Sequence, residues 1–265
     1  MKPPLKWVGG KAWAVPILTK VWKSFKKPQV CELFAGGSAF SFALGHEHTI
    51  LNDINPHLIN YYRWLREGLV ISDEVAFKNT EDKYYKIREI FNILNSNGFE
   101  NSRFTAILFY YLNKTGYRGL YRINKGGGFN VPYGNYKKIG YVYNFLPHKD
   151  MMETWQLSCK DFRQMDVPPN YLIYADPPYH GGFTGYNGDT WSEEDTRELI
   201  GYLTLHAGPA ALSYKYSDWV IDLLKKYGWN VGYYDAPRGF HEAGSIESEI
   251  IATKPPKTLK DYNFG

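Results

Sequence analysis

The chain has 265 residues, of which 44% are hydrophobic, enough for one large domain or for a domain with a sizeable insertion. It has no run of 18 apolar residues, and its first residues lack the apolar stretch of a signal peptide. We therefore expect a cytoplasmic protein with no membrane association. The seven histidines lack the spacing of metal ligands, so no metal site is expected. Cys31 and Cys159 lie in apolar segments that predict strands, which favours reduced core thiols over a disulfide.

The net charge of +4 is unevenly distributed along the chain. Residues 101–149 contain no Asp or Glu and hold eight basic residues and eight tyrosines, whereas the rest of the chain has 23 basic and 27 acidic residues. Basic residues interleaved with aromatic residues and glycines are typical of a nucleic-acid surface. A solvated basic loop is the alternative, but such a loop does not require a complete absence of acidic residues.

Residues 5–11 read Leu-Lys-Trp-Val-Gly-Gly-Lys and precede a predicted amphipathic helix through Leu18 and Phe25. The two glycines allow the backbone to approach a ligand closely. On this segment alone, a simple helix start remains an alternative.

Residues 29–53 predict a strand, a turn at Gly36 and Gly37, a helix, and a second strand that ends at Asp53. An acidic residue about 20 positions after a glycine-rich turn binds a nucleotide ribose in doubly wound folds. The turn lacks the third glycine of a dinucleotide motif, and there is no P-loop. An adenosine-binding half-domain is therefore predicted.

Three helices are predicted next, one from Pro56, one over 71–97 and one over 102–113, and we interpret them as packing elements. The basic loop over 113–138 follows, and its run 129–133 between glycines predicts a β-hairpin. Residues 158–162 end a further strand, where Asp161 and Phe162 are candidates to line an adenine ring.

Residues 171–175 are apolar or aromatic and predict a buried strand in the middle of a parallel sheet. Asp176, Pro177, Pro178 and Tyr179 follow at its carboxyl end, outside which ligands bind in open α/β sheets. The prolines make a stiff elbow without N–H donors. Such a site can hold an exocyclic amino group between Asp176 and a proline carbonyl, with Tyr179 stacked on the attached ring. A strand followed by a proline turn is the alternative.

The glycine-rich residues 180–188 are predicted either to close over a substrate or to be disordered. Ser192 predicts the N-cap of a helix that ends near His206. A strand at 210–213, a helix at 219–227 and two strands at 231–234 and 246–252 complete the predicted sheet.

Asp-Pro-Pro-Tyr resembles the catalytic tetrapeptide of the amino-methyltransferases, which methylate adenine N6 or cytosine N4 in DNA. Lys-Trp-x-Gly-Gly-Lys and Phe34-Ala-Gly36-Gly37 are similar to motifs of the Dam-type adenine methyltransferases, and residues 116–138 resemble their target-recognition hairpin. The resemblance implies a Rossmann-like, S-adenosylmethionine-dependent α/β methyltransferase sheet with an inserted helical and β-hairpin DNA-recognition subdomain. The implied catalytic domain comprises residues 1–60 and 150–255, the insertion residues 61–149, and the tail residues 256–265.

The same resemblance implies roles for individual residues. The tetrapeptide Asp176–Tyr179 would be catalytic. Binding of S-adenosylmethionine would involve nine residues: Trp7, Lys11, Phe34, Gly36, Gly37, Asp53, Asp161, Phe162 and Asp176.

In the recognition of GATC, Arg122 would read a guanine, Leu120 and Pro132 would line the thymine, Tyr117 would wedge into the base stack, and Lys6 would contact the outer guanine. Further DNA-binding candidates are Arg118, Asn124, Tyr136, Lys137 and Lys138, of which Arg118 departs from the residue expected at its position. Since residues 101–149 contain no acid, we expect the Arg122 guanidinium to be free for a bidentate contact with guanine.

The implied reaction is methylation of adenine N6 in double-stranded DNA, with the base flipped out of the duplex. Asp rather than Ser or Asn at position 176 favours adenine by resemblance. A cytosine-N4 or protein-glutamine methyltransferase and a non-catalytic DNA-binding protein on the same fold are the alternatives. We expect a monomer in a bacterial or phage-infected cell.

Overall fold

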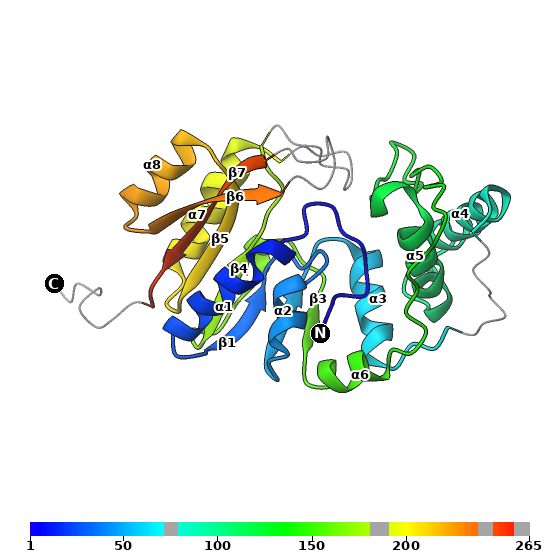
Figure 1. The fold of residues 1–265 in the computed structure, drawn as a ribbon, viewed down its shortest axis with the longest axis horizontal. Coiled ribbons are helices and arrows are strands. Elements are labelled where there is room, and N and C mark those ends of the chain that lie inside the picture. The colour runs from blue at the N-terminus through cyan, green and yellow to red at the C-terminus, as the bar shows by residue number, and fades with distance from the viewer. Residues whose placement is uncertain (72–78, 181–190, 238–245, 257–265) are drawn as a thin grey trace.

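The computed structural model describes residues 1–71, 79–180, 191–237 and 246–256 (Figure 1). The described chain contains a seven-stranded sheet in the order β3-β2-β1-β4-β5-β7-β6. The strands are β1 (Gln29–Glu32), β2 (Thr49–Asn52), β3 (Gln156–Ser158), β4 (Tyr171–Ala175), β5 (Ala210–Lys215), β6 (Asn230–Pro237) and β7 (Ile246–Lys254).

β1 to β5 run parallel, and β7 is antiparallel to both β5 and β6. The register pairs Glu32 with Tyr174, and it pairs Glu249 of β7 with Lys215 of β5. The carboxyl ends of β1, β2 and β4 therefore meet at one edge. This edge carries the glycine turn, Asp53 and Asp176, as the doubly wound interpretation predicts.

Consecutive residues of β4 point to opposite faces of the sheet, because side chains alternate along a strand. Leu172 and Tyr174 pack in a cluster with Leu18 and Phe40, from α1 (Val15–Ser24) and α2 (Ala39–Leu44). Ile173 packs on the other face, under α7 (Glu193–Leu205) and α8 (Asp218–Lys226). A strand covered on both faces needs an uncharged sequence, which explains the run at 171–175.

α7 begins where the sequence predicts. Ser192 accepts a hydrogen bond from the backbone N–H of Asp195, and the Asp195 side chain accepts one from the N–H of Ser192. The two residues form a capping box that satisfies donors at the helix start. The helix ends at Leu205, with His206 as its C-cap.

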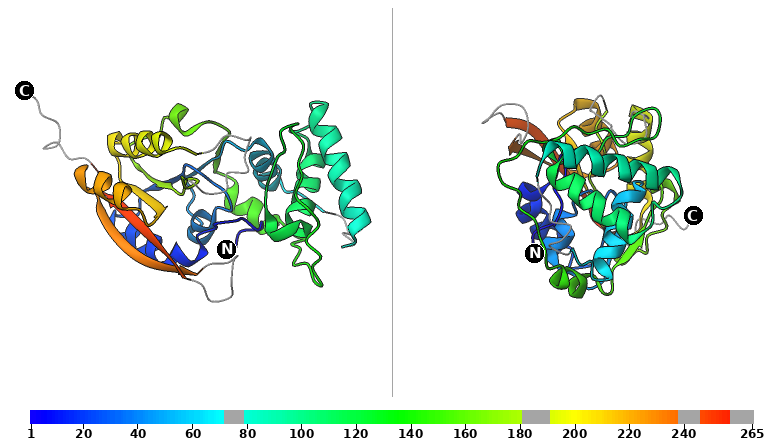
Figure 2. Two further views of the ribbon diagram at one scale, coloured as in Figure 1. Left: turned by 90° about the horizontal axis from the view of Figure 1, so that it is seen from above. Right: turned by 90° about the vertical axis from the view of Figure 1, so that its right-hand side faces the viewer.

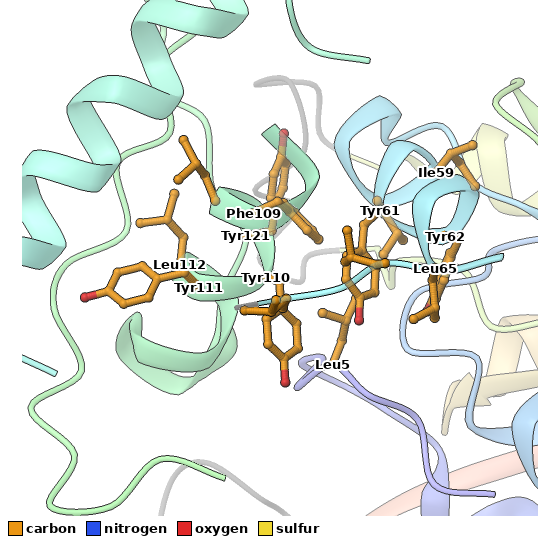
Figure 3. Packing of buried hydrophobic residues seen from close by; sticks show 14 of the residues in the cluster. Leu5, Ile59, Tyr61, Tyr62, Leu65, Phe109, Tyr110, Tyr111, Leu112 and Tyr121 are labelled. Carbon is orange, nitrogen blue, oxygen red and sulfur yellow. The ribbon is translucent and has the colours of Figure 1, made fainter. Parts of the chain in front are cut away.

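A second core forms around α3 (Pro56–Arg66), α4 (Glu81–Ser96), α5 (Arg103–Thr115) and α6 (Leu146–Met152) (Figure 3). Tyr61 of α3 stacks on Tyr110 of α5 with ring centroids 5.8 Å apart and an interplanar angle of 4°. Figures 1 and 2 place α4 and α5 at the end of the molecule away from β6 and β7. The predicted division into residues 1–60 with 150–255, an insertion 61–149 and a tail stays a prediction.

The structure corrects two expectations from the sequence and confirms a third. The helix predicted over 71–97 begins only at Glu81, after the extended cap Thr80. The predicted hairpin is present, although it forms no regular strand among the described residues: antiparallel bridges join Ile123 to Phe129 and Gly116 to Tyr133, and the Asn130 N–H donates to the Arg122 carbonyl at 3.0 Å. Phe129 and Val131 of this hairpin are buried in the second core. Cys31 is a buried thiol as expected, but Cys159 is exposed because it lies just beyond the end of β3.

Some expectations fall on residues outside the described ranges. These are the first part of the helix over 71–97, the glycine-rich segment after His180 and most of the C-terminal tail. Within the described ranges, no helix is both long and apolar enough to span a membrane.

Candidate functional site

Asp176 follows directly on β4, and its side chain is 21% exposed. Lys11 Nζ lies 3.1 Å from Asp176 Oδ1 and 3.6 Å from Glu249 Oε2 of β7. Lys11 also donates to the Gly9 carbonyl at 2.8 Å, and the Tyr179 hydroxyl donates to Glu249 Oε2 at 3.4 Å. The Lys11 ammonium therefore connects the elbow after β4 to strand β7.

The sequence did not single out Glu249. The available signal was an acidic residue directly before the apolar residues 250–252 of a predicted strand, at a buried position. Buried acidic side chains are rare unless they are paired.

Burial raises the pKa of Asp176, while the neighbouring Lys11 acts in the opposite direction and favours the carboxylate. Burial by itself would lower the pKa of Lys11, but Asp176 and Glu249 outweigh it, so the pKa of Lys11 is raised. The lysine is thus a cation at neutral pH. Lys11 and Asp176 Oδ1 form an ion pair at 3.1 Å, and among the described residues no hydrogen bond of regular geometry reaches this oxygen.

The elbow after Asp176 is fixed by packing on β5. The Tyr179 ring lies 5.0 Å from the Tyr214 ring at 52°, and the His180 N–H donates to the Tyr214 hydroxyl at 3.1 Å. Pro177 is buried, and Tyr179 is only partly covered. In the tetrapeptide predicted from the sequence to be catalytic, the backbone is therefore fixed against β5. The Tyr179 ring lies beside it, and the Asp176 carboxylate can accept a further hydrogen bond.

The glycine turn after β1 lies against the Trp7 ring. A Cβ on Gly36 would lie 2.8 Å from Trp7 Nε1, and one on Gly37 would lie 3.1 Å from Trp7 Cβ. Gly36 also has a φ of +45°, which disfavours other residues. Asp53 Oδ2 accepts the Gly36 N–H at 3.0 Å, so the structure brings four predicted cofactor residues together.

Phe34, which follows β1, lies near the two other predicted residues of this edge. Its ring is 5.8 Å from that of buried Phe162 and 5.6 Å from that of Trp191. Asp161 caps the short 3-10 helix Phe162–Gln164 and pairs with Arg163 at 3.1 Å. Phe34 is thus a partly exposed ring that packs against the buried Phe162, whereas Asp161 is already paired with a cation.

The N-terminal segment connects the sheet to the basic loop. Lys6 exchanges backbone hydrogen bonds with the Asn113 side chain at 2.9 and 2.6 Å. The Lys6 ammonium donates to the Lys114 carbonyl at 3.0 Å and lies 3.8 Å from the centroid of the Tyr136 ring. Lys6 and Tyr136, both predicted to bind DNA, are therefore neighbours.

The turn at Tyr117–Gly119 presents an aromatic side chain to solvent. Tyr117 is 42% exposed, and the Arg118 guanidinium lies 5.1 Å from its ring centroid. Arg118 has a φ of +56°, and its N–H donates to the Tyr136 hydroxyl at 2.6 Å. This hydrogen bond fixes the strained backbone that holds Tyr117 outward, next to Leu120, which is partly exposed.

The expectation of a free Arg122 guanidinium is wrong. Arg122 Nε donates to Asn130 Oδ1 at 2.6 Å, and Nη2 donates to the Asn130 carbonyl at 3.0 Å. Without an acid nearby, an amide from the same loop takes the role of partner. Asn130 therefore orients the Arg122 guanidinium. Since a guanidinium has five N–H donors, these two hydrogen bonds leave other donors available for a DNA base.

The remaining predicted DNA contacts lie on the outside of the loop. Asn124 Oδ1 accepts the N–H groups of Gly126 and Gly128 at 3.0 and 2.9 Å, so its side chain shapes the turn. Pro132, Lys137 and Lys138 are exposed. In the described part of the chain, no group of three or more His, Cys, Asp or Glu side chains is placed to hold a metal ion.

The sheet order and the elbow after β4 define an α/β methyltransferase. Residues 7–230 match the family model described as D12 class N6 adenine-specific DNA methyltransferase. The chain belongs to this family. It is an enzyme that methylates adenine N6 in DNA, as the sequence predicts, and the cytosine and non-catalytic alternatives are not supported.

Three relatives illustrate the similarity. The retron Ec67 DNA adenine methylase of Escherichia coli is 35% identical over 222 residues, which are 77% of this chain and 72% of the relative. The type II methyltransferase M.MjaIII of Methanocaldococcus jannaschii is 34% identical over 230 residues, 75% and 78% of the two chains. The DNA adenine methylase of Haemophilus influenzae is 34% identical over 215 residues, 75% and 72%.

Proposed function

We propose that the protein transfers a methyl group from S-adenosylmethionine to N6 of a flipped adenine in double-stranded GATC, with Asp176 as the catalytic acceptor. The observation that carries the proposal is the Asp176 carboxylate at the carboxyl edge of β4. Its Oδ1 accepts no hydrogen bond from the described residues, although Lys11 lies beside it. An amino group can fill that acceptor position.

The residues at the edge of the sheet fit the proposed cofactor. Asp53 uses two acceptor positions on backbone N–H groups, and a carboxylate has about four, so ribose hydroxyls can be accepted as well. The partly exposed Phe34 ring, backed by the buried Phe162, offers an apolar contact for the adenine ring. Gly36 and Gly37 form the turn that packs on Trp7. Asp161 and Lys11 are the other residues that we propose to bind the cofactor.

The chemistry asks the protein mainly for positioning. S-adenosylmethionine supplies a methyl group whose bond to sulfur breaks, with the electron pair left on sulfur, as the N6 lone pair forms the new C–N bond. Asp176 and the Pro177 carbonyl would hold the amino hydrogens, so that the lone pair is aimed at the methyl carbon. The nitrogen becomes positive, and Asp176 stabilises this charge and then takes the released proton, which passes to water.

Base flipping follows from the position of N6 inside a duplex. The partly exposed ring of Tyr179 beside Asp176 suits the flipped base, and the exposed Tyr117 suits the gap that it leaves. For GATC, support comes from the resemblance of Lys6 and of the loop residues Leu120, Arg122 and Pro132 to the target-recognition residues of Dam-type enzymes. Arg118, Asn124, Tyr136, Lys137 and Lys138 would position the DNA backbone.

We further propose that the enzyme acts as a monomer. Bacterial and phage relatives, such as the DNA N-6-adenine-methyltransferase of phage P1, fit our expectation of a bacterial or phage-infected host cell.

The proposal is tested by expressing the protein in a methylation-free bacterial host and mapping methylated bases across the genome. We expect N6-methyladenine at GATC and no N4-methylcytosine. Methylation confined to another adenine-containing site would contradict the GATC assignment and retain the activity. With purified protein, methylation that depends on S-adenosylmethionine tests the donor separately.

A further inference from the structure

Glu249 lies inside the protein at the edge of the site. Its side chain is 9% exposed, and the strand continues with the buried residues Ile250, Ile251 and Ala252. A buried carboxylate is costly unless it is paired. Two of the groups that contact Glu249 are Lys11 at 3.6 Å and the Tyr179 hydroxyl at 3.4 Å. Both partners also border Asp176, so the location of Glu249 points to the site.

The charges around Lys11 are unequal. Asp176 is the nearer carboxylate at 3.1 Å, and alone with Lys11 it would form a neutral pair. Glu249 supplies a second negative charge beside the same ammonium. The methylated amine becomes positive in the transition state, and a carboxylate near that charge stabilises it.

Glu249 also holds the two groups in place. Lys11 is drawn toward β7 by Glu249 and toward the Gly9 carbonyl by a hydrogen bond of 2.8 Å. Because the ammonium has three N–H donors, Asp176 shares it with the Gly9 carbonyl and with Glu249. The Tyr179 ring is fixed at its hydroxyl by Glu249 and on its side by Tyr214.

We propose that Glu249 is a positioning residue for methyl transfer, which shares Lys11 with Asp176 and fixes Tyr179, so that Asp176 keeps its capacity to accept the target amine. Glu249 itself forms and breaks no covalent bond and takes no proton. The inference rests on the proposed role of Asp176 and adds a residue outside the Asp-Pro-Pro-Tyr elbow to the site.

The test is Glu249→Gln, which preserves the shape of the side chain and removes its charge. We expect kcat to fall roughly tenfold to a hundredfold, the range of one interaction with a charged group. The Kd for a GATC duplex, measured by fluorescence anisotropy, should change less than about twofold, since the lost interaction acts in the transition state. A normal kcat, or a loss confined to DNA binding, overturns the proposal.

Two further variants separate charge from structure. Glu249→Asp retains the charge and should be more active than Glu249→Gln; equal or lower activity contradicts the proposed role of charge. In a Lys11→Met background, Glu249→Gln should cost less than in the wild type, because no ammonium remains for the two carboxylates to share. An equal cost in both backgrounds shows that Glu249 does not act through Lys11.

Asp235→Asn is the matched control, because it removes an exposed carboxylate from the neighbouring strand β6. It should leave kcat unchanged. Asp176→Ala in the same assay separates the proposed role of Asp176 from the inference about Glu249. Activity in that variant refutes the role of Asp176 itself, whereas an inactive Asp176→Ala beside a fully active Glu249→Gln refutes only the inference about Glu249.

Discussion

The backbone N–H of Gly36 donates a hydrogen bond of 3.0 Å to Asp53 Oδ2, which ties the turn after β1 to the end of β2. Asp53 Oδ1 accepts the Asn55 N–H at 2.9 Å, just before α3. One buried carboxylate thus holds the backbone on both sides of the proposed ribose site. A change at Asp53 should therefore affect both binding of the ribose and the local backbone structure.

Asp53→Ala should weaken S-adenosylmethionine binding by about 1.5–3 kcal/mol, the value of a hydrogen bond to a charged group. Titration calorimetry measures this loss directly, and thermal melting measures the accompanying loss of stability from the unpaired Gly36 N–H. Asp53→Asn retains one acceptor oxygen and should lie between the wild type and Asp53→Ala. Unchanged affinity in both variants would refute the ribose role.

Asp176→Ala should abolish methylation while DNA binding stays near that of the wild type. The physical reason is that the elbow holds no other acid, and Glu249, on strand β7, is already engaged with Lys11. The measurement is single-turnover methylation together with duplex binding. Turnover close to the wild-type rate would refute the catalytic assignment.

The sequence predicted the parallel strands and their ligand-binding edge. Uncharged runs such as 171–175 indicate buried strands, and a polar residue directly after such a run, here Asp176, marks the edge where ligands bind. It could not predict Glu249, which reaches Lys11 only because β7 inserts between β5 and β6. The Asn130 partner of Arg122 was missed for a similar reason. The absence of acids excluded an ion pair, but an amide eight residues away satisfied the guanidinium.

Acid should destabilise the fold through His57. Burial lowers the pKa of His57 to about 4, although Glu100 acts in the opposite direction, and the ring packs between Phe91 and Tyr121 in the second core. The folded pKa lies below the unfolded value of about 6.5, so the neutral ring is favoured in the fold. Above pH 6.5 His57 costs the fold no free energy of unfolding. As the pH falls from 6.5 to 4, the stability lost through this group increases.

At pH 5, this group should cost about 2 kcal/mol relative to pH 7.5. Urea unfolding of the wild type and of His57→Gln at both pH values measures the difference. The variant should lose less stability between the two conditions by about that amount. An identical loss in both proteins would show that His57 does not contribute to the acid sensitivity.

Arg122→Ala should change sequence preference more than overall affinity. Asn130 orients the guanidinium, and an oriented bidentate contact with guanine discriminates by about 1–3 kcal/mol. Methylation should therefore fall at GATC and rise, relatively, at duplexes altered at one guanine. Asn130→Ala should shift the preference in the same direction by a smaller amount, since it loosens Arg122 without removing it.

Lys137→Ala and Lys138→Ala are the matched controls, because both lysines are exposed cations of the same loop. If they meet phosphates, each change should weaken binding to every duplex equally and flatten the salt dependence by about one unit. Methylation rates on a set of single-base-altered duplexes, measured at several salt concentrations, separate the two behaviours. If Arg122→Ala slows every duplex by the same factor, Arg122 contacts only the DNA backbone, and the GATC assignment loses its main physical support.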